Sequence, residues 1–217
     1  MGHSLAIPAS APVMVLEGCN FFPGTPLPLH IYEMRYRAML ALALEGDRMF
    51  CLGTAIDSTS QVLPADPAAG VYSHGTLGLV RACVQNEDGT ANLILEGLQR
   101  VVFRGWLRET PFRIARLEGL QTLVEDPELV KHHASRVVVL SRVLIERGAG
   151  RKPPEFDLGW AAEANPELLG DFVANYLVTS FVDRHRLLGM ACLDERLQFL
   201  GELLKGQLGS LGPDGWT

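Results

Sequence analysis

The 217-residue chain is 47% hydrophobic, carries a formal net charge of −6 and contains four cysteines. Its length allows one large domain or two small ones, and its apolar fraction is ample for a buried core. No run approaches the roughly 18 apolar residues of a membrane-spanning helix, and residues 1–16 lack the basic start of a secretion signal, so we expect a cytoplasmic protein.

The first informative segment, residues 22–37, reads FPGTPLPLHIYEMRYR. Its three prolines each fix φ and remove a backbone donor, which predicts an extended connector rather than an interior strand. A helix should follow, because Glu33 and Arg37 have the spacing of a helix-surface ion pair. The apolar face of this helix is expected to contain Met34, Ala38, Met39 and Leu42.

Alternating apolar residues predict about six strands before the chain becomes helical. An Asp-Gly pair within residues 86–89 predicts a hairpin turn between two of these strands. Six strands and one helix are enough for a closed or nearly closed antiparallel sheet. The expected strands are residues 13–16, 49–56, 79–85, 91–96, 101–108 and 112–120.

Helical periodicity begins near residue 125, so we divide the chain into a β-rich subdomain, 1–123, and a helical subdomain, 124–217. Asp126 and Asn165 each precede a proline, a pattern that predicts a capped helix start. We interpret the charged run 183–186 as a turn. Three apolar stripes predict helices that pack on one another: Val130, Ala134, Val137, Ser141, Leu144 and Ile145; Leu169, Phe172, Val173, Tyr176 and Leu177; and Leu197, Leu200, Leu203, Leu204 and Leu208.

Residues 22–37 resemble the signature of the amino-terminal substrate-recognition domain of the Lon protease family, also called the peptidase S16 LON domain. That signature reads Phe-Pro-Gly, Pro-Leu-His-Ile-Phe-Glu and Arg-Tyr-Arg; here Tyr32 replaces its Phe, and residues 17–20 depart from its approach strand. Later motifs extend the resemblance over about residues 10–208. It implies an α+β fold, in which an antiparallel, β-barrel-like (PUA-like) sheet with one helix precedes a helical bundle, as in bacterial members.

A complete Lon protease carries an ATPase module and a proteolytic module after this region. The sequence has no Gly-x-x-x-x-Gly-Lys-Ser/Thr loop for ATP phosphates. Ser135 and Ser141 follow Lys131 in sequence, and both fall in a predicted helix, which is not the setting of a Ser/Lys catalytic pair. We therefore expect a free-standing, non-enzymatic recognition domain that needs no cofactor and no metal, and a hydrolase is disfavoured.

We interpret the signature residues as structural. His30, Glu33 and Arg35 are chemically capable of catalysis, but the resemblance places them in a structural motif. Glu33 is expected to cap the helix or to pair with Arg37. The signature residues are Phe22, Pro23, Gly24, Pro28, His30, Glu33, Arg35 and Tyr36.

The cysteine spacing argues against a structural metal site, because no two cysteines form a close pair. Buried, reduced thiols are the better interpretation of Cys19, Cys51, Cys83 and Cys192. The adjacent His132 and His133 point in different directions on a helix, so we expect them on a solvated face.

The segment 57–74 is the candidate binding loop, because loops of this length are often functional, although a tolerated insertion fits equally well. An extended peptide could dock beside it through apolar side chains and a strand edge. The resemblance implies an unfolded or specific protein ligand and a role in protein quality control. The candidate contact residues are Asp57, Leu63, Val71, Tyr72 and His74.

The alternative is an RNA-binding module, because the PUA-like fold is known for RNA contact. Arg100, Arg104 and Arg108 are predicted to share one strand face, with Arg113 and Arg116 on the next strand. The net charge of −6 disfavours nucleic acid as a partner. A solvated or ion-paired arginine face remains the plainer interpretation.

Overall fold

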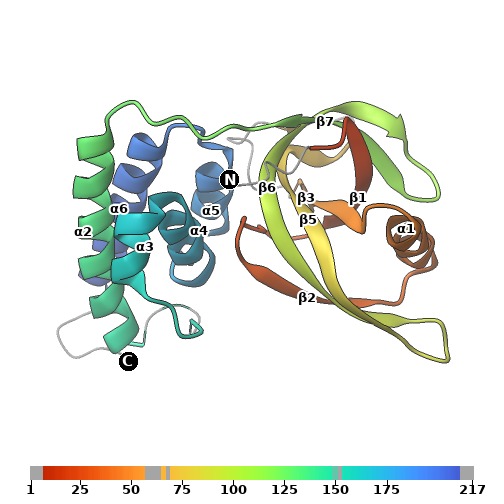
Figure 1. The fold of residues 1–217 in the computed structure, drawn as a ribbon, viewed down its shortest axis with the longest axis horizontal. Coiled ribbons are helices and arrows are strands. Elements are labelled where there is room, and N and C mark those ends of the chain that lie inside the picture. Colours follow the sequence, from red (N-terminus) through yellow and green to blue (C-terminus); the bar gives the residue numbers. More distant parts are fainter. Residues whose placement is uncertain (1–6, 57–64, 67–68, 149, 151–152, 211–217) are drawn as a thin grey trace. The chain divides into compact units, whose positions relative to one another are not determined.

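The computed structural model describes residues 7–56, 65–66, 69–148, 150 and 153–210. The chain divides into two compact units, Met1–Leu120 and Gln121–Thr217, the first rich in strands and the second helical (Figure 1). None of the described helices combines the length and the apolar character that crossing a membrane requires.

The β-rich unit is built from one helix and seven strands among the described residues. In chain order these are β1 (Ser10–Leu16), β2 (Pro26–Ile31), α1 (Met34–Glu45), β3 (Met49–Ala55), β4 (Ala65–Asp66), β5 (Val71–Gln85), β6 (Ala91–Arg108) and β7 (Arg113–Gly119). The sheet order is β2-β6-β7-β1-β3-β5-β4, and β5 also pairs with β6, so five strands form a ring. The α+β, barrel-like architecture is thus as predicted.

One pair of strands departs from the antiparallel pattern, because β1 and β3 run parallel. The chain between them passes through β2 and α1, and such a crossover brings it back in its original direction. The pair 91–96 and 101–108, predicted as two strands, is the single long strand β6, and β5 begins at Val71 rather than at residue 79. Both long strands stay paired through register shifts at residues 77–78 and 80–82.

The prolines exclude an interior strand, as predicted, but residues 26–31 form the paired strand β2 rather than a connector outside the sheet. This strand pairs only with β6, so it lies at an edge of the sheet. Proline is tolerated there because its missing N–H can face away from the ladder. The predicted hairpin turn is confirmed: the Asn86 amide donates to the Thr90 carbonyl at 2.8 Å, and Gly89 takes a positive φ of 79°.

The core of this unit has two apolar clusters, because successive strand residues point to opposite faces. One cluster packs against α1 and the other includes Val13, Cys51 and Leu77. The buried face of α1 differs from the predicted one, since Met34 is 75% exposed. Its buried residues are Tyr36, Met39, Leu40 and Ala43.

The helical unit contains five described helices. They are α2 (Pro127–Glu146), α3 (Leu158–Ala164), α4 (Pro166–Tyr176), α5 (Phe181–Gly189) and α6 (Leu193–Ser210). The predicted caps are confirmed, because the Asp126 carboxylate accepts from the Glu128 and Leu129 amides and the Asn165 side chain accepts from the Leu168 amide.

The charged run 183–186 lies inside α5, so its interpretation as a turn is wrong. Ser180 caps this helix by accepting from the Asp183 amide at 3.3 Å. His185, in the middle of the run, is buried, because α5 turns that side chain inward. The predicted apolar stripes are largely buried, except that Ile145 is exposed.

Candidate functional site

An apolar groove with a volume of about 460 Å³ lies on the β-rich unit, where β2 and β5 flank β6. The strand register places its residues in rows across the three strands. Pro28 lies opposite Ile94, and Ile94 lies opposite Ala82. The groove is lined by Pro28, Leu29, His30, Ala82, Cys83, Val84, Asn92, Leu93 and Ile94.

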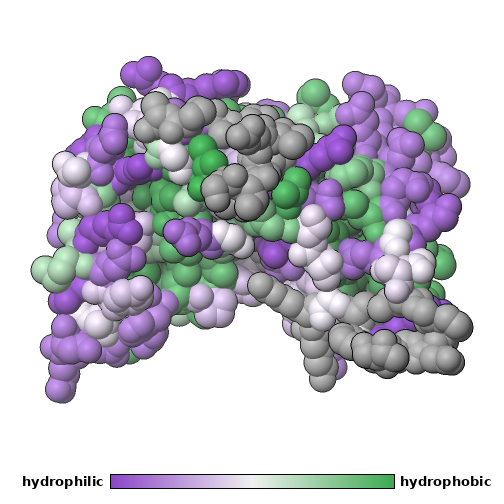
Figure 2. Space-filling view, turned by 180° about the vertical axis from the view of Figure 1, so that it is seen from behind, coloured by the Kyte–Doolittle hydropathy of each residue, from purple (hydrophilic) through white to green (hydrophobic). Residues whose placement is uncertain are grey.

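Several apolar side chains of the groove reach solvent. Val84 is 64% exposed, Ala82 and Pro28 are exposed, and Ile94 is half-buried. Figure 2 shows one face of the molecule on which hydrophobic residues lie at the surface between hydrophilic ones. Exposed apolar residues that adjoin one another on a sheet are typical of a surface that binds another molecule.

Polar and aromatic groups lie at the His30 end of the groove. The His30 ring nitrogen Nδ1 donates to Asn92 Oδ1 at 2.8 Å. Tyr32, which is 64% exposed, stacks on His30 with ring centroids 6.0 Å apart. The groove therefore offers an apolar floor, an aromatic face and an amide, which suits apolar side chains of a polypeptide.

The Phe-Pro-Gly turn fixes the start of β2 on β6. Phe22 is fully buried, and the Gly24 amide donates to the Gly97 carbonyl at 2.9 Å. In return the Gly97 amide donates to the Thr25 carbonyl at 3.0 Å. A Cβ atom on Gly97 would lie 2.2 Å from the Phe22 carbonyl oxygen, so only glycine allows this approach. The turn positions one wall of the groove.

The helix part of the signature anchors α1 to β1. The Tyr36 hydroxyl donates to the Val15 carbonyl at 2.8 Å and accepts from the Val15 amide at 3.2 Å. Burial raises the pKa of Tyr36. Glu33 neither caps α1 nor pairs with Arg37 as predicted; it accepts from Arg35 Nε at 2.7 Å, which raises the pKa of Arg35. Two of the signature residues, Pro28 and His30, thus line the groove, and Tyr36 fixes α1 on β1.

The candidate binding loop 57–74 needs a correction at its end. Asp57 and Leu63 lie outside the described residues. Val71 and Tyr72 belong to β5 and are 1% and 0% exposed, so their side chains are not available to a ligand. They are ordered because β5 pairs there with both β3 and β4. His74 also lies in β5, where burial and then Arg104 lower its pKa.

The arginines of β6 do not form a free basic face, and the ion pair of Arg104 agrees with the plainer interpretation. Arg100 is buried, whereas Arg104 is exposed and donates to Glu118 Oε2 at 2.7 Å. This bond raises the pKa of Arg104 and lowers that of Glu118. Register shifts in β6 between Phe103 and Arg108 interrupt the two-residue alternation that was expected to place Arg108 beside Arg104.

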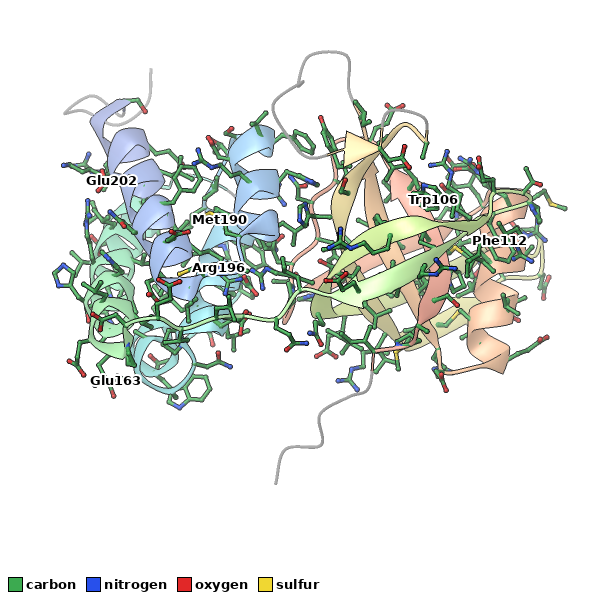
Figure 3. All side chains as sticks on the ribbon, turned by 90° about the horizontal axis from the view of Figure 1, so that it is seen from above. Trp106, Phe112, Glu163, Met190, Arg196 and Glu202 are labelled. Atoms are coloured by element: carbon green, nitrogen blue, oxygen red, sulfur yellow. The ribbon has the colours of Figure 1, made fainter. Side chains whose placement is uncertain are left out.

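Two further arginines of this region stack on aromatic rings. The Arg108 guanidinium lies 4.0 Å from the Phe112 ring centroid, and that of Arg113 lies 5.1 Å from Trp106. Figure 3 labels Trp106 and Phe112 on the β-rich unit. Cation–π contacts of this kind hold the guanidinium groups against the protein, which leaves less of a free basic surface for RNA.

The serine nearest to a lysine does not pair with it. Ser135 Oγ donates to the backbone carbonyl of Lys131 at 2.9 Å, and Lys131 Nζ donates to Glu128 at 2.7 Å. A nucleophile and its base must lie within hydrogen-bond reach of each other. These two side chains therefore do not form a catalytic pair.

The four cysteines are free thiols, but only Cys51 is fully buried, and burial raises its pKa. Cys19, Cys83 and Cys192 are half-buried, so the prediction of four buried thiols is wrong for these three. His132 is exposed as expected. His133 is half-buried, and burial lowers its pKa.

The groove was not predicted from the sequence, because the residues that line it come from three different strands. The pairing of β5 with β6 brings Val84, Asn92 and Ile94 together. That β2 pairs with the other edge of β6 could not be predicted, because β2 is distant from both strands in the sequence.

A family model described as the ATP-dependent protease La (LON) substrate-binding domain matches residues 10–206. The Lon protease of Xanthomonas oryzae pv. oryzae is 27% identical over 203 residues, which cover 91% of this chain and 23% of the relative. The Lon protease of Azospirillum brasilense is 26% identical over 201 residues, with 92% and 24% covered. The chain thus spans about a quarter of the length of these curated relatives.

Two solved structures share the fold. The N-terminal domain of Mycobacterium avium complex Lon protease matches with a TM-score of 0.66 at 15% identity, over 90% of this chain and 98% of that one. A Lon N-terminal domain protein from Xanthomonas campestris matches with a TM-score of 0.60 at 20% identity, over 94% and 99%. Both likenesses support the fold alone.

Proposed function

Because the chain belongs to the family of the ATP-dependent protease La (LON) substrate-binding domain, we propose that it is a non-catalytic module that recognises unfolded or damaged polypeptides in protein quality control. The observation that carries this proposal is the exposed apolar groove on β2, β6 and β5. Unfolded chains differ from folded ones chiefly in the apolar side chains that they expose. A groove with an apolar floor therefore binds unfolded chains in preference to folded ones.

The mode of binding follows from the edge strand. Pro26 and Pro28 carry no N–H, so the free edge of β2 offers few donors to an added strand. We therefore expect a ligand to bind through its side chains in the groove rather than by extending the sheet. Such contacts tolerate many sequences, because hydrophobic burial is not directional.

The test is a fluorescence anisotropy titration with the purified protein. The probe is a labelled, permanently unfolded polypeptide such as reduced, carboxymethylated lactalbumin, and the controls are its folded form and a single-stranded RNA. We expect saturable binding of the unfolded chain alone. Saturation by RNA alone, or by neither probe, would refute the proposal.

A matched pair of variants assigns the binding to the groove. Val84→Glu places a charge in the groove, and Val139→Glu places the same charge on α2 of the helical unit; the two side chains are 64% and 62% exposed. Burying a valine contributes about 1.5–3 kcal/mol, so Val84→Glu should weaken binding by about tenfold or more. Equal affinities of the two variants would show that the groove is not the site.

The non-catalytic part of the proposal has its own assay. The purified protein is incubated with casein, with and without ATP, and both ATP hydrolysis and casein fragments are followed. We expect neither product above the rate of a buffer control. ATP hydrolysis or casein cleavage that copurifies with the protein would contradict the non-catalytic part of the proposal.

A further inference from the structure

The helical unit contains a cluster of three side chains of the kinds that bind metal ions. Glu125, Cys192 and Asp194 each offer a ligand atom, and these atoms all lie within 4.8 Å of one another. The cluster forms because the segment before α2 runs beside the start of α6. The Leu193 amide donates to the Leu123 carbonyl at 2.9 Å.

Asp194 is the buried member of this cluster and is only 7% exposed. Its Oδ2 accepts from the Asp126 amide at 3.0 Å. Its Oδ1 is buried and has no hydrogen-bond partner among the residues that the structure describes. A buried carboxylate oxygen without a donor is costly, and most such atoms in proteins are satisfied by a hydrogen bond, a water or an ion.

Neighbouring cations do not neutralise the cluster. Within the described part of the chain, neither Glu125 nor Asp194 forms an ion pair. The buried Arg196, labelled in Figure 3, lies two residues beyond Asp194 but directs its guanidinium to Glu167 Oε1 at 3.3 Å and to Thr122. Among the residues that the structure describes, the two carboxylates and the thiol therefore lie together without an ion-pair partner.

We propose that Glu125, Cys192 and Asp194 bind a divalent transition-metal ion, for which zinc is the best chemical match. A thiolate disfavours Mg²⁺ and Ca²⁺, which prefer oxygen ligands alone, and it suits Zn²⁺, which accepts both sulfur and carboxylate oxygen. Zinc lies at about 2.3 Å from sulfur and about 2.0–2.2 Å from oxygen in a tetrahedral site. A modest contraction of the cluster meets these distances, and water supplies the fourth ligand.

The imidazole of His133, outside this three-residue cluster, interacts electrostatically with Asp194. His133 of α2 is near enough to Asp194 for the carboxylate to raise its pKa, although burial lowers that pKa overall. Its Nδ1 is buried and has no hydrogen-bond partner in the described part of the chain. His133 is outside the 4.8 Å group, so it is not one of the proposed ligands.

A bound ion would link the segment before α2 to the first turn of α6 through its ligands. The sequence analysis expected no metal because it required closely spaced ligand pairs. Here two ligands come from Cys192 and Asp194, and the third is separated from them by more than sixty residues. Metal binding of this kind stabilises the folded state, because the unfolded chain does not hold the ligands together.

The test uses the full chain, reduced and freed of metal with a chelator. Zinc uptake is measured by competition with a chromophoric chelator, and cobalt is added separately because a thiolate bound to Co²⁺ gives a charge-transfer absorption band. We expect one equivalent of zinc, the cobalt band, and a rise in the melting temperature with zinc. A folded wild-type protein that takes up no zinc and shows no cobalt band would overturn the proposal.

Variants locate the site. Cys192→Ser should abolish the cobalt band, and Glu125→Gln, which changes an exposed side chain and leaves the fold intact, should weaken zinc binding by at least about tenfold, since loss even of an outer partner costs about 10–100-fold. Cys19→Ser, which changes a half-buried thiol of the β-rich unit outside the groove, is the matched control and should bind as the wild type does. Equal zinc affinity of Cys192→Ser and Cys19→Ser would refute the assignment.

Discussion

Gly97→Ala tests whether the Phe-Pro-Gly turn is held by its close approach to β6. The added Cβ would lie 2.2 Å from the Phe22 carbonyl oxygen and 3.0 Å from the Cα of Pro23. Both neighbours are backbone, so the turn itself must move. Overpacking of this kind costs about 1–3 kcal/mol, and the two hydrogen bonds between Gly97 and the turn contribute about 1 kcal/mol each. We expect the free energy of unfolding to fall by about 3 kcal/mol.

The assay is urea unfolding followed by the fluorescence of Trp106, which lies in the β-rich unit. The other two tryptophans are replaced by phenylalanine in every variant. Gly46→Ala is the control, because its Cβ would meet only ordinary contacts at 3.7 Å and 3.9 Å. It should change stability by less than about 0.5 kcal/mol. A midpoint for Gly97→Ala equal to that of Gly46→Ala would refute the reasoning.

Three further predictions concern single side chains of the β-rich unit. Tyr36→Phe leaves the Val15 amide and carbonyl without their hydroxyl partner and should cost about 1–3 kcal/mol in urea unfolding; an unchanged midpoint would contradict this. Burial holds the pKa of His74 below its usual 6.5, so the unfolded chain binds the proton first and stability is lost as the pH falls below that value. His74→Asn should flatten this decline, and an identical pH profile would argue against it. Because burial raises the pKa of the Cys51 thiol, a disulfide reagent should modify it only on unfolding, and four equally fast thiols in the native protein would disprove that.

Local signals in the sequence were read correctly where one residue decides the structure. Asp126 and Asn165 cap helices because each stands directly before a proline, and Gly89 closes a hairpin because it accepts a positive φ. The resemblance drawn from residues 22–37 is confirmed by the family match over residues 10–206. These features depend on neighbours in the chain, which the sequence displays.

The errors concern partners that are distant in the sequence. Arg104 and Arg108 were assigned one face because strand residues alternate, but the register shifts that interrupt the alternation before Arg108 arise from the pairing of β6 with β7. Glu33 is a local exception, because it was expected to cap α1 or to pair with Arg37 and instead pairs with Arg35. The groove and the cluster around Asp194 are likewise assembled by tertiary contacts, so no local pattern could have predicted them.

The most direct test of the recognition site is a nuclear magnetic resonance titration of the isotope-labelled protein with an unfolded, unlabelled polypeptide. If the groove is the site, the amide signals that shift should cluster on β2, β5 and β6 around Pro28, Val84 and Ile94, and they should saturate together. Shifts confined to the helical unit, or no shifts at concentrations that saturate the anisotropy signal, would contradict the account.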